Sequence, residues 1–145
     1  MGLRDKYTKA VEEQNKGAWI ELTHEDEKNS DGTSPCFCVR KASFTNKKHL
    51  LAAMRVSKQY KKKNKYDDNE LLGDIDYGID LFCETSLVDW KDFEPEEDGN
   101  KMDFNIKNAK KIFAQEIWYE LYKALEEKLM EMDKDEEDSE EDAKN

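Results

Sequence analysis

Apolar and polar positions along the first third of the chain predict a helix followed by a pair of strands. Residues 3–14 place apolar side chains at helical spacing, and the pattern stops before Gly17. The segments 18–22 and 36–40 are typical of strands, and the polar stretch between them contains a strong turn signal at 29–32. We therefore expect a short helix and then a β-hairpin with a long loop. A lone hairpin is marginal in water, so helices must cover one of its faces.

The rest of the chain predicts further amphipathic helices. Asn46 is a suitable N-cap for a helix that ends in the lysine cluster 61–63. Asn105 can cap a last helical region, which is either one helix or two with a joint near 114–116. A helix between these two repeats apolar residues every three to four positions, at Leu71, Leu72, Ile75, Ile79, Phe82, Leu87 and Trp90. The predicted fold class is α+β and mostly helical: an N-terminal β-hairpin packed against three to four amphipathic helices.

Length and composition divide the chain into one domain and a tail. The 145 residues suit a single domain at 1–130, and the apolar fraction of 37% predicts a small core. The last fifteen residues, 131–145, hold nine acidic and two basic side chains, so we expect a disordered acidic tail. The chain contains no apolar run long enough to cross a bilayer, and its first residues do not resemble a signal peptide. We expect a soluble protein that works in a cytoplasm.

The net charge of −11 is unevenly distributed. Residues 40–66 carry ten basic side chains and no acidic one, whereas residues 67–104 carry fourteen acidic and two basic ones. These blocks can neutralise each other within one chain, or join copies of the chain head to tail. The candidate residues for self-association are Lys58, Lys61, Lys62, Lys63, Asp74, Asp76 and Asp80. The basic block and its aromatic residues could also contact phosphates, but we do not expect nucleic-acid binding because an acidic helix follows directly.

Motifs for catalysis and metal binding are missing from the sequence. The glycines are scattered singly, and no serine elbow, HExxH motif or paired CxxC occurs. Cys36 and Cys38 would share one face of a strand, yet with Cys83 they form neither an even disulfide set nor a recognisable zinc site. We expect free, buried thiols, no metal, no cofactor and no enzymatic activity.

Several short motifs resemble those of the tailed-bacteriophage tail assembly chaperones, over residues 15–125. In the second half they are Leu87-Val88-Asp89-Trp90-Lys91-Asp92-Phe93, the turn Asp98-Gly99-Asn100, Met102-Asp103-Phe104, Asn108-Ala109 and Ile112-Phe113. In the first half they are Gly17-Ala18-Trp19-Ile20, Phe37-Cys38-Val39-Arg40-Lys41-Ala42-Ser43 and a basic helix after Asn46. The chain departs from the family at Asn105-Ile106-Lys107, where Ser/Thr-Pro-Glu is frequent.

This resemblance implies a non-enzymatic protein that acts during virion assembly. Such chaperones bind the long tape measure protein in the host cytoplasm, keep it soluble and extended until the tail tube polymerises, often self-associate, and are absent from the finished particle. Our candidate contact face for the tape measure protein is the longest apolar stripe, Trp118, Leu121, Tyr122, Leu125 and Leu129. The alternative for this stripe is that it forms the core of the domain itself.

Two other functions remain open at this stage. The first is a minor structural protein of the virion, in the tail or neck, with the same fold. The second is an acidic DNA mimic that inhibits a nuclease, which the net charge of −11 suggests but the basic block opposes.

Overall fold

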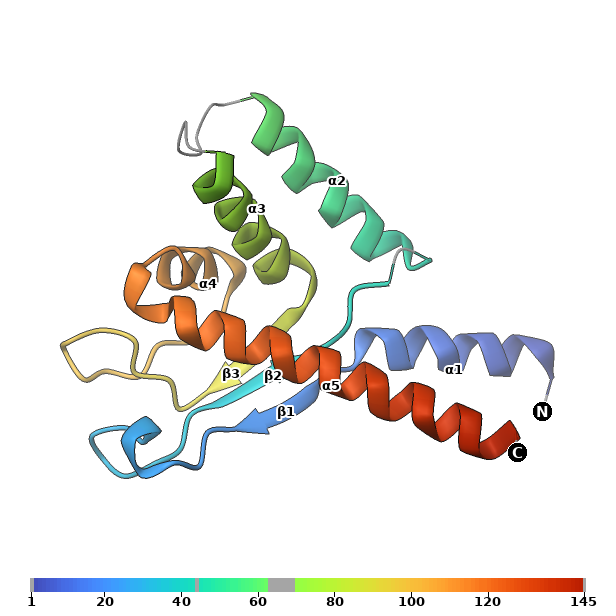
Figure 1. Ribbon diagram of the computed structural model, residues 1–145, viewed down its shortest axis with the longest axis horizontal. Coiled ribbons are helices and arrows are strands. Elements are labelled where there is room, and N and C mark those ends of the chain that lie inside the picture. Colours follow the sequence, from blue (N-terminus) through green and yellow to red (C-terminus); the bar gives the residue numbers. More distant parts are fainter. Residues whose placement is uncertain (1, 44, 63–69, 145) are drawn as a thin grey trace.

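The chain folds as an α+β structure in which a small antiparallel sheet carries helices on one face (Figure 1). The computed structural model describes residues 2–43, 45–62 and 70–144, with side chains described in these ranges except at 61, 62, 70–72 and 133–144. The described elements, in chain order, are α1 (Leu3–Asn15), β1 (Ala18–Glu21), η1 (Glu25–Glu27), β2 (Cys36–Val39), α2 (Lys47–Lys62), α3 (Glu70–Thr85), β3 (Leu87–Lys91), α4 (Ile106–Phe113), η2 (Glu116–Trp118) and α5 (Tyr119–Lys144).

The sheet has the strand order β1-β2-β3, and both pairings are antiparallel. The predicted hairpin is confirmed, because Ile20 pairs with Phe37 in a regular β1–β2 register. Strand alternation turns Phe37 and Trp90 toward the helices, whereas Trp19 and Cys38 lie on the outer face of the sheet. Among the described elements, α3, α4 and α5 pack on the face that carries Phe37 and Trp90, and the core lies between them and the sheet (Figure 1).

The third strand corrects the sequence-based prediction, which placed Leu87 and Trp90 on the preceding helix. Helix α3 ends at Thr85, and the chain then pairs with β2. The register shifts there, and Val88 is the extra residue of a β-bulge. Because of the bulge, Leu87 and Trp90 both face the core although they lie three residues apart. A spacing of three residues also occurs in helices, which is why the sequence pattern predicts that the helix extends to Trp90.

The other helix predictions are confirmed in place and in their capping. The side-chain oxygen of Asn46 accepts a hydrogen bond from the Lys48 N–H at 3.0 Å, at the start of α2. Asn105 caps α4 in the same way, through the Asn108 N–H at 2.7 Å. The last helical region is two helices, since η2 lies between α4 and α5 at the predicted joint.

Aromatic rings fill the core beneath the sheet. Phe93 meets three of them edge-on, with ring centroids at 5.0 Å from Phe37, 5.1 Å from Trp90 and 5.1 Å from Trp118. On the helical side, a Cβ at Gly78 would lie 3.1 Å from the hydroxyl of Tyr122. This glycine in α3 therefore leaves room for the end of the Tyr122 side chain from α5.

A junction of polar groups fixes where α1 and α2 leave the sheet. The Arg40 guanidinium donates from Nη1 to the Asn15 carbonyl at 2.9 Å and from Nε to the Thr85 carbonyl at 3.0 Å. These carbonyls lie at the C-terminal ends of α1 and α3, where the helix dipoles favour a cation. The side-chain amide of Asn46 adds bonds of 3.3 Å to Gln14 and to Asn15. We call these contacts the Arg40 junction.

His49 lies beside this junction and is 2% exposed. Its Nδ1 accepts a hydrogen bond from the Ser43 N–H at 2.9 Å, whereas its buried Nε2 has no partner among the described atoms. Burial, and then the charges of Arg40 and Lys48, lower the pKa of His49 below its ordinary value of 6.5. The folded chain therefore holds this imidazole neutral.

The backbone of α5 continues as a helix to Lys144. Our prediction of a disordered tail concerns residues 131–145. The side chains of residues 133–145 lie outside the part of the chain that the structure describes. Within the described ranges, no helix combines the length and the apolar character that a membrane span requires.

Arg40→Met should lower the free energy of unfolding by about 2 kcal/mol, because it leaves two helix-terminal carbonyls without their charged donor. Urea denaturation followed by circular dichroism measures the change. The control is Lys107→Met at an exposed position, expected within about 0.5 kcal/mol of wild type. Equal effects of the two substitutions would contradict a stabilising role for the Arg40 junction.

His49 should make stability depend on pH near neutrality. As the pH falls through 6.5, the unfolded chain binds a proton that the folded chain does not, so stability present above this pH is lost below it. We expect the free energy of unfolding to decline between about pH 7.5 and about pH 5.5. His49→Asn should flatten the decline, and His24→Asn, at an exposed position, should leave it intact. An unchanged decline in His49→Asn would contradict the assignment.

Candidate partner-binding surface

The apolar stripe on α5 that the sequence offered as a contact face belongs mainly to the core. Tyr122 is 7% exposed and Leu125 is 1% exposed, and both pack in the central cluster. Trp118, Leu121 and Leu129 are half-buried against the same cluster. The stripe is therefore corrected from a free binding face to the surface by which α5 covers the sheet, which is the alternative that the sequence left open.

The basic and acidic blocks meet within the chain. The Arg55 guanidinium of α2 lies 2.6 Å from the Glu84 carboxylate of α3, and Lys110 of α4 lies 2.8 Å from the same carboxylate. Burial raises the pKa of Glu84, but the bonds from Lys110 and Arg55 outweigh burial and hold the pKa below its usual value. The Tyr60 hydroxyl also donates to Asp74 at 3.1 Å. Part of the predicted charge complementarity is thus satisfied between neighbouring helices of one molecule.

The predicted self-association residues are distributed accordingly. Lys58 and Asp74 are exposed, and Asp76 and Asp80 are half-buried on α3. The side chains of Lys61, Lys62 and Lys63 lie outside the described residues. Head-to-tail association through these charges stays a prediction.

Helix α1 presents three large, exposed apolar residues. Leu3 is 74%, Tyr7 59% and Val11 51% exposed, and α1 has no buried residue among the thirteen that the structure describes. These three residues follow one another at a spacing of four and so lie along one side of the helix. We call them the α1 stripe. An isolated helix of this length is marginal in water, so a partner on the stripe would stabilise it.

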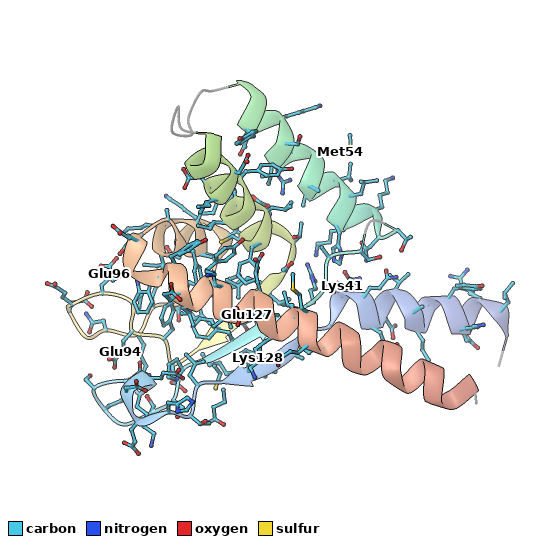
Figure 2. All side chains as sticks on the ribbon, viewed as in Figure 1. Lys41, Met54, Glu94, Glu96, Glu127 and Lys128 are labelled. Atoms are coloured by element: carbon cyan, nitrogen blue, oxygen red, sulfur yellow. The ribbon has the colours of Figure 1, made fainter. Side chains whose placement is uncertain are left out.

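Helix α2 presents a second group. Its buried residues are His49, Ala52 and Val56, whereas three large apolar side chains stay exposed: Leu50 at 40%, Leu51 at 53% and Met54 at 50%. Figure 2 shows Met54 on the side of α2 that faces away from α3. Lys47 and Lys58, both exposed, precede and follow these residues by about one helical turn. We call Leu50, Leu51 and Met54 the α2 patch.

The Arg40 junction holds the two groups in a fixed relation at their inner ends, and α1 and α2 diverge from it (Figure 1). An open hollow of about 660 Å³ lies beside the junction, lined by residues of α1, of the segment 39–43 and of α5. The sequence did not single out this surface. The signal in the sequence was that α2 is apolar on two sides.

The cysteines offer no reactive group. Cys36, Cys38 and Cys83 are free, and Cys36 and Cys38 share the outer face of the sheet as predicted. Burial raises the pKa of all three thiols, to about 12 for Cys83, so they are protonated at neutral pH. Among the described residues, no three His, Cys, Asp or Glu side chains are arranged to hold a metal ion.

Comparison with known proteins found no matching family model, no matching curated protein and no matching solved structure. A functional assignment therefore depends on the surface itself and on the motifs in the sequence.

Replacing leucine by alanine should affect stability differently on the core face of α5 and on the exposed α2 patch. Leu125→Ala is expected to lower the free energy of unfolding by about 3 kcal/mol, because it opens a cavity in the core. Leu51→Ala should change it by less than about 0.5 kcal/mol. Thermal and urea denaturation of both variants test this, and similar small losses would contradict the packing of α5.

Proposed function

We propose that this chain is a phage tail assembly chaperone that binds the tape measure protein in the host cytoplasm and keeps it soluble. The observation that carries the proposal is the exposure of the α1 stripe and the α2 patch. Six large apolar side chains on two helices are a substantial exposed apolar surface for a chain of 145 residues. Such a surface suits transient contact with an amphipathic helical partner.

The positions of the exposed residues fit recognition of a helix. Leu50 and Met54 are four residues apart and Leu51 and Met54 three, so they form one side of α2. An amphipathic helix is bound by apolar anchors at these spacings. The flanking Lys47 and Lys58 favour a partner helix with acidic residues at its borders. A tape measure protein that is long and helix-rich would offer many such segments.

The second-half motifs behind the family resemblance meet in one structural unit, which further supports the proposal. The Trp90 indole N–H donates to the Met102 carbonyl at 2.6 Å, and the Met102 N–H donates to the Phe93 carbonyl at 2.9 Å. The Asn108 side chain donates to the Asp103 carbonyl at 3.0 Å. Gly99 has a φ of +71°, as its place in the predicted turn requires. The motif residues thus act together in joining β3 to α4.

The proposal predicts a long, helix-rich reading frame next to the one for this chain, and co-expression of the two products tests it. We expect the chain to keep that partner in the soluble fraction and to co-purify with it. The double variant Leu51→Gln and Met54→Gln should weaken binding by on the order of tenfold or more, because it removes two apolar anchors. The variant Tyr7→Gln and Val11→Gln tests the α1 stripe in the same way.

Met130→Gln is the matched control, because Met130 is 66% exposed but belongs to neither group. It should bind like wild type. A partner that stays soluble without this chain, or that binds both double variants unchanged, would contradict the proposal. Mass spectrometry of purified virus particles distinguishes the chaperone from the alternative function. Stoichiometric amounts of the chain in the particles would make it a structural protein of the virion.

A further inference from the structure

The two edge strands of the sheet differ in whether their outward backbone N–H and C=O groups are blocked from pairing with another strand. At the β3 edge, the Trp90 N–H donates to the carboxylate of the adjacent Asp89 at 2.8 Å. The bulge at Val88 and the positive φ of 54° at Asp92 interrupt the strand on both sides. Bulges and charged side chains are devices by which proteins prevent edge strands from pairing with other chains. The β3 edge is therefore protected.

The β1 edge has neither a bulge nor a side chain that caps an outward N–H among its described residues. The Leu22 N–H donates to the Pro35 carbonyl at 2.9 Å, so Leu22, and by alternation Ile20, direct their backbone groups toward β2. Trp19 and Glu21 consequently direct their N–H and C=O groups away from the sheet. Strand β1 contains neither proline nor lysine, and its pairing with β2 is regular. It is a template for one further strand.

We propose that β1 pairs antiparallel with β1 of a second copy of this chain, so that the two sheets join across a two-fold axis. In the register we favour, Trp19 lies opposite Glu21 of the second copy, and the axis passes beside Ile20. Each strand then uses all four outward backbone groups of Trp19 and Glu21, and the contact is self-complementary, as a two-fold axis requires.

Charge and burial on the outer face favour a second copy in this register. The Lys91 Nζ lies 4.3 Å from the ring centroid of Trp19, which is 45% exposed. Glu21 of the second copy would stand beside this indole and bring a carboxylate toward the Lys91 ammonium. If the two-fold axis passed beside Glu21 instead of Ile20, Glu21 would lie opposite Glu21 of the second copy, and the two carboxylates would repel each other. The pairing also covers part of the exposed indole.

This inference does not depend on the proposed function. Neither the α1 stripe nor the α2 patch contributes a residue to β1, so a dimer could form whether or not the chain binds a tape measure protein. It also differs from head-to-tail association through the charged blocks, because it is two-fold symmetric and stops at two copies.

Sedimentation equilibrium of the full chain, over concentrations from about 5 µM to about 500 µM, tests the proposal. We expect a reversible dimer. Glu21→Pro should weaken it by on the order of tenfold or more, because proline removes an outward N–H but leaves the bonds between β1 and β2 in place. Trp19→Glu removes the indole and places a carboxylate opposite Glu21 of the second copy, so it should act in the same direction, which keeps the test valid if the proline variant does not fold.

Ile117→Lys is the control, because Ile117 is 73% exposed and lies outside the sheet. It should dimerise like wild type. Hydrogen exchange gives a second readout: the amides of Trp19 and Glu21 should gain protection as the concentration rises, whereas that of Ile20 should be protected throughout. A monomer over the whole range, a dimer that both edge variants retain, or protection of these amides by another protein without dimerisation would overturn the proposal.

Discussion

The guanidinium of Arg40 is the contact on which the arrangement of the helices depends. It bonds the last carbonyls of α1 and α3 from a position just after the central strand, and the Arg40 N–H donates to the Ser86 carbonyl at 2.8 Å. Since α1 buries none of its described side chains, this charge and the amide of Asn46 are what hold its inner end. The direction in which α1 carries its exposed stripe away from the sheet follows from these two side chains.

Periodicity alone predicted most of the elements, because each carried one apolar face and an identifiable start. The helices that begin after Asn46 and Asn105 have side-chain caps, and the hairpin has a turn. The third strand could not be found in this way. A single extra residue at Val88 changes the strand repeat from two to three, and a spacing of three is what a helix shows.

The binding surface was harder to predict than the fold. A stripe such as Tyr122 and Leu125 identifies an amphipathic face, but the spacing does not say whether the protein or a partner covers it. Whether the protein itself covers such a stripe depends on how many helices pack on one face of the small sheet. This number is a property of the tertiary structure. On α2, the smaller residues Ala52 and Val56 face inward where α3 lies close, and the larger Leu51 and Met54 remain outside. Hydrophobicity alone would place the larger apolar side chains inside, whereas on α2 the smaller ones are buried.

The short connection between α1 and β1 has a consequence for sequence divergence. A Cβ at Gly17 would collide with the Sγ of Cys38 and would lie 3.1 Å from the Val39 carbonyl oxygen. A side chain can therefore appear at position 17 only if the side chain at position 38 gives way and the strand shifts slightly. Positions 17 and 38 should change together in related chains, as a pair of compensating substitutions. Such covariation would identify this connection in sequences too divergent for their motifs to be aligned.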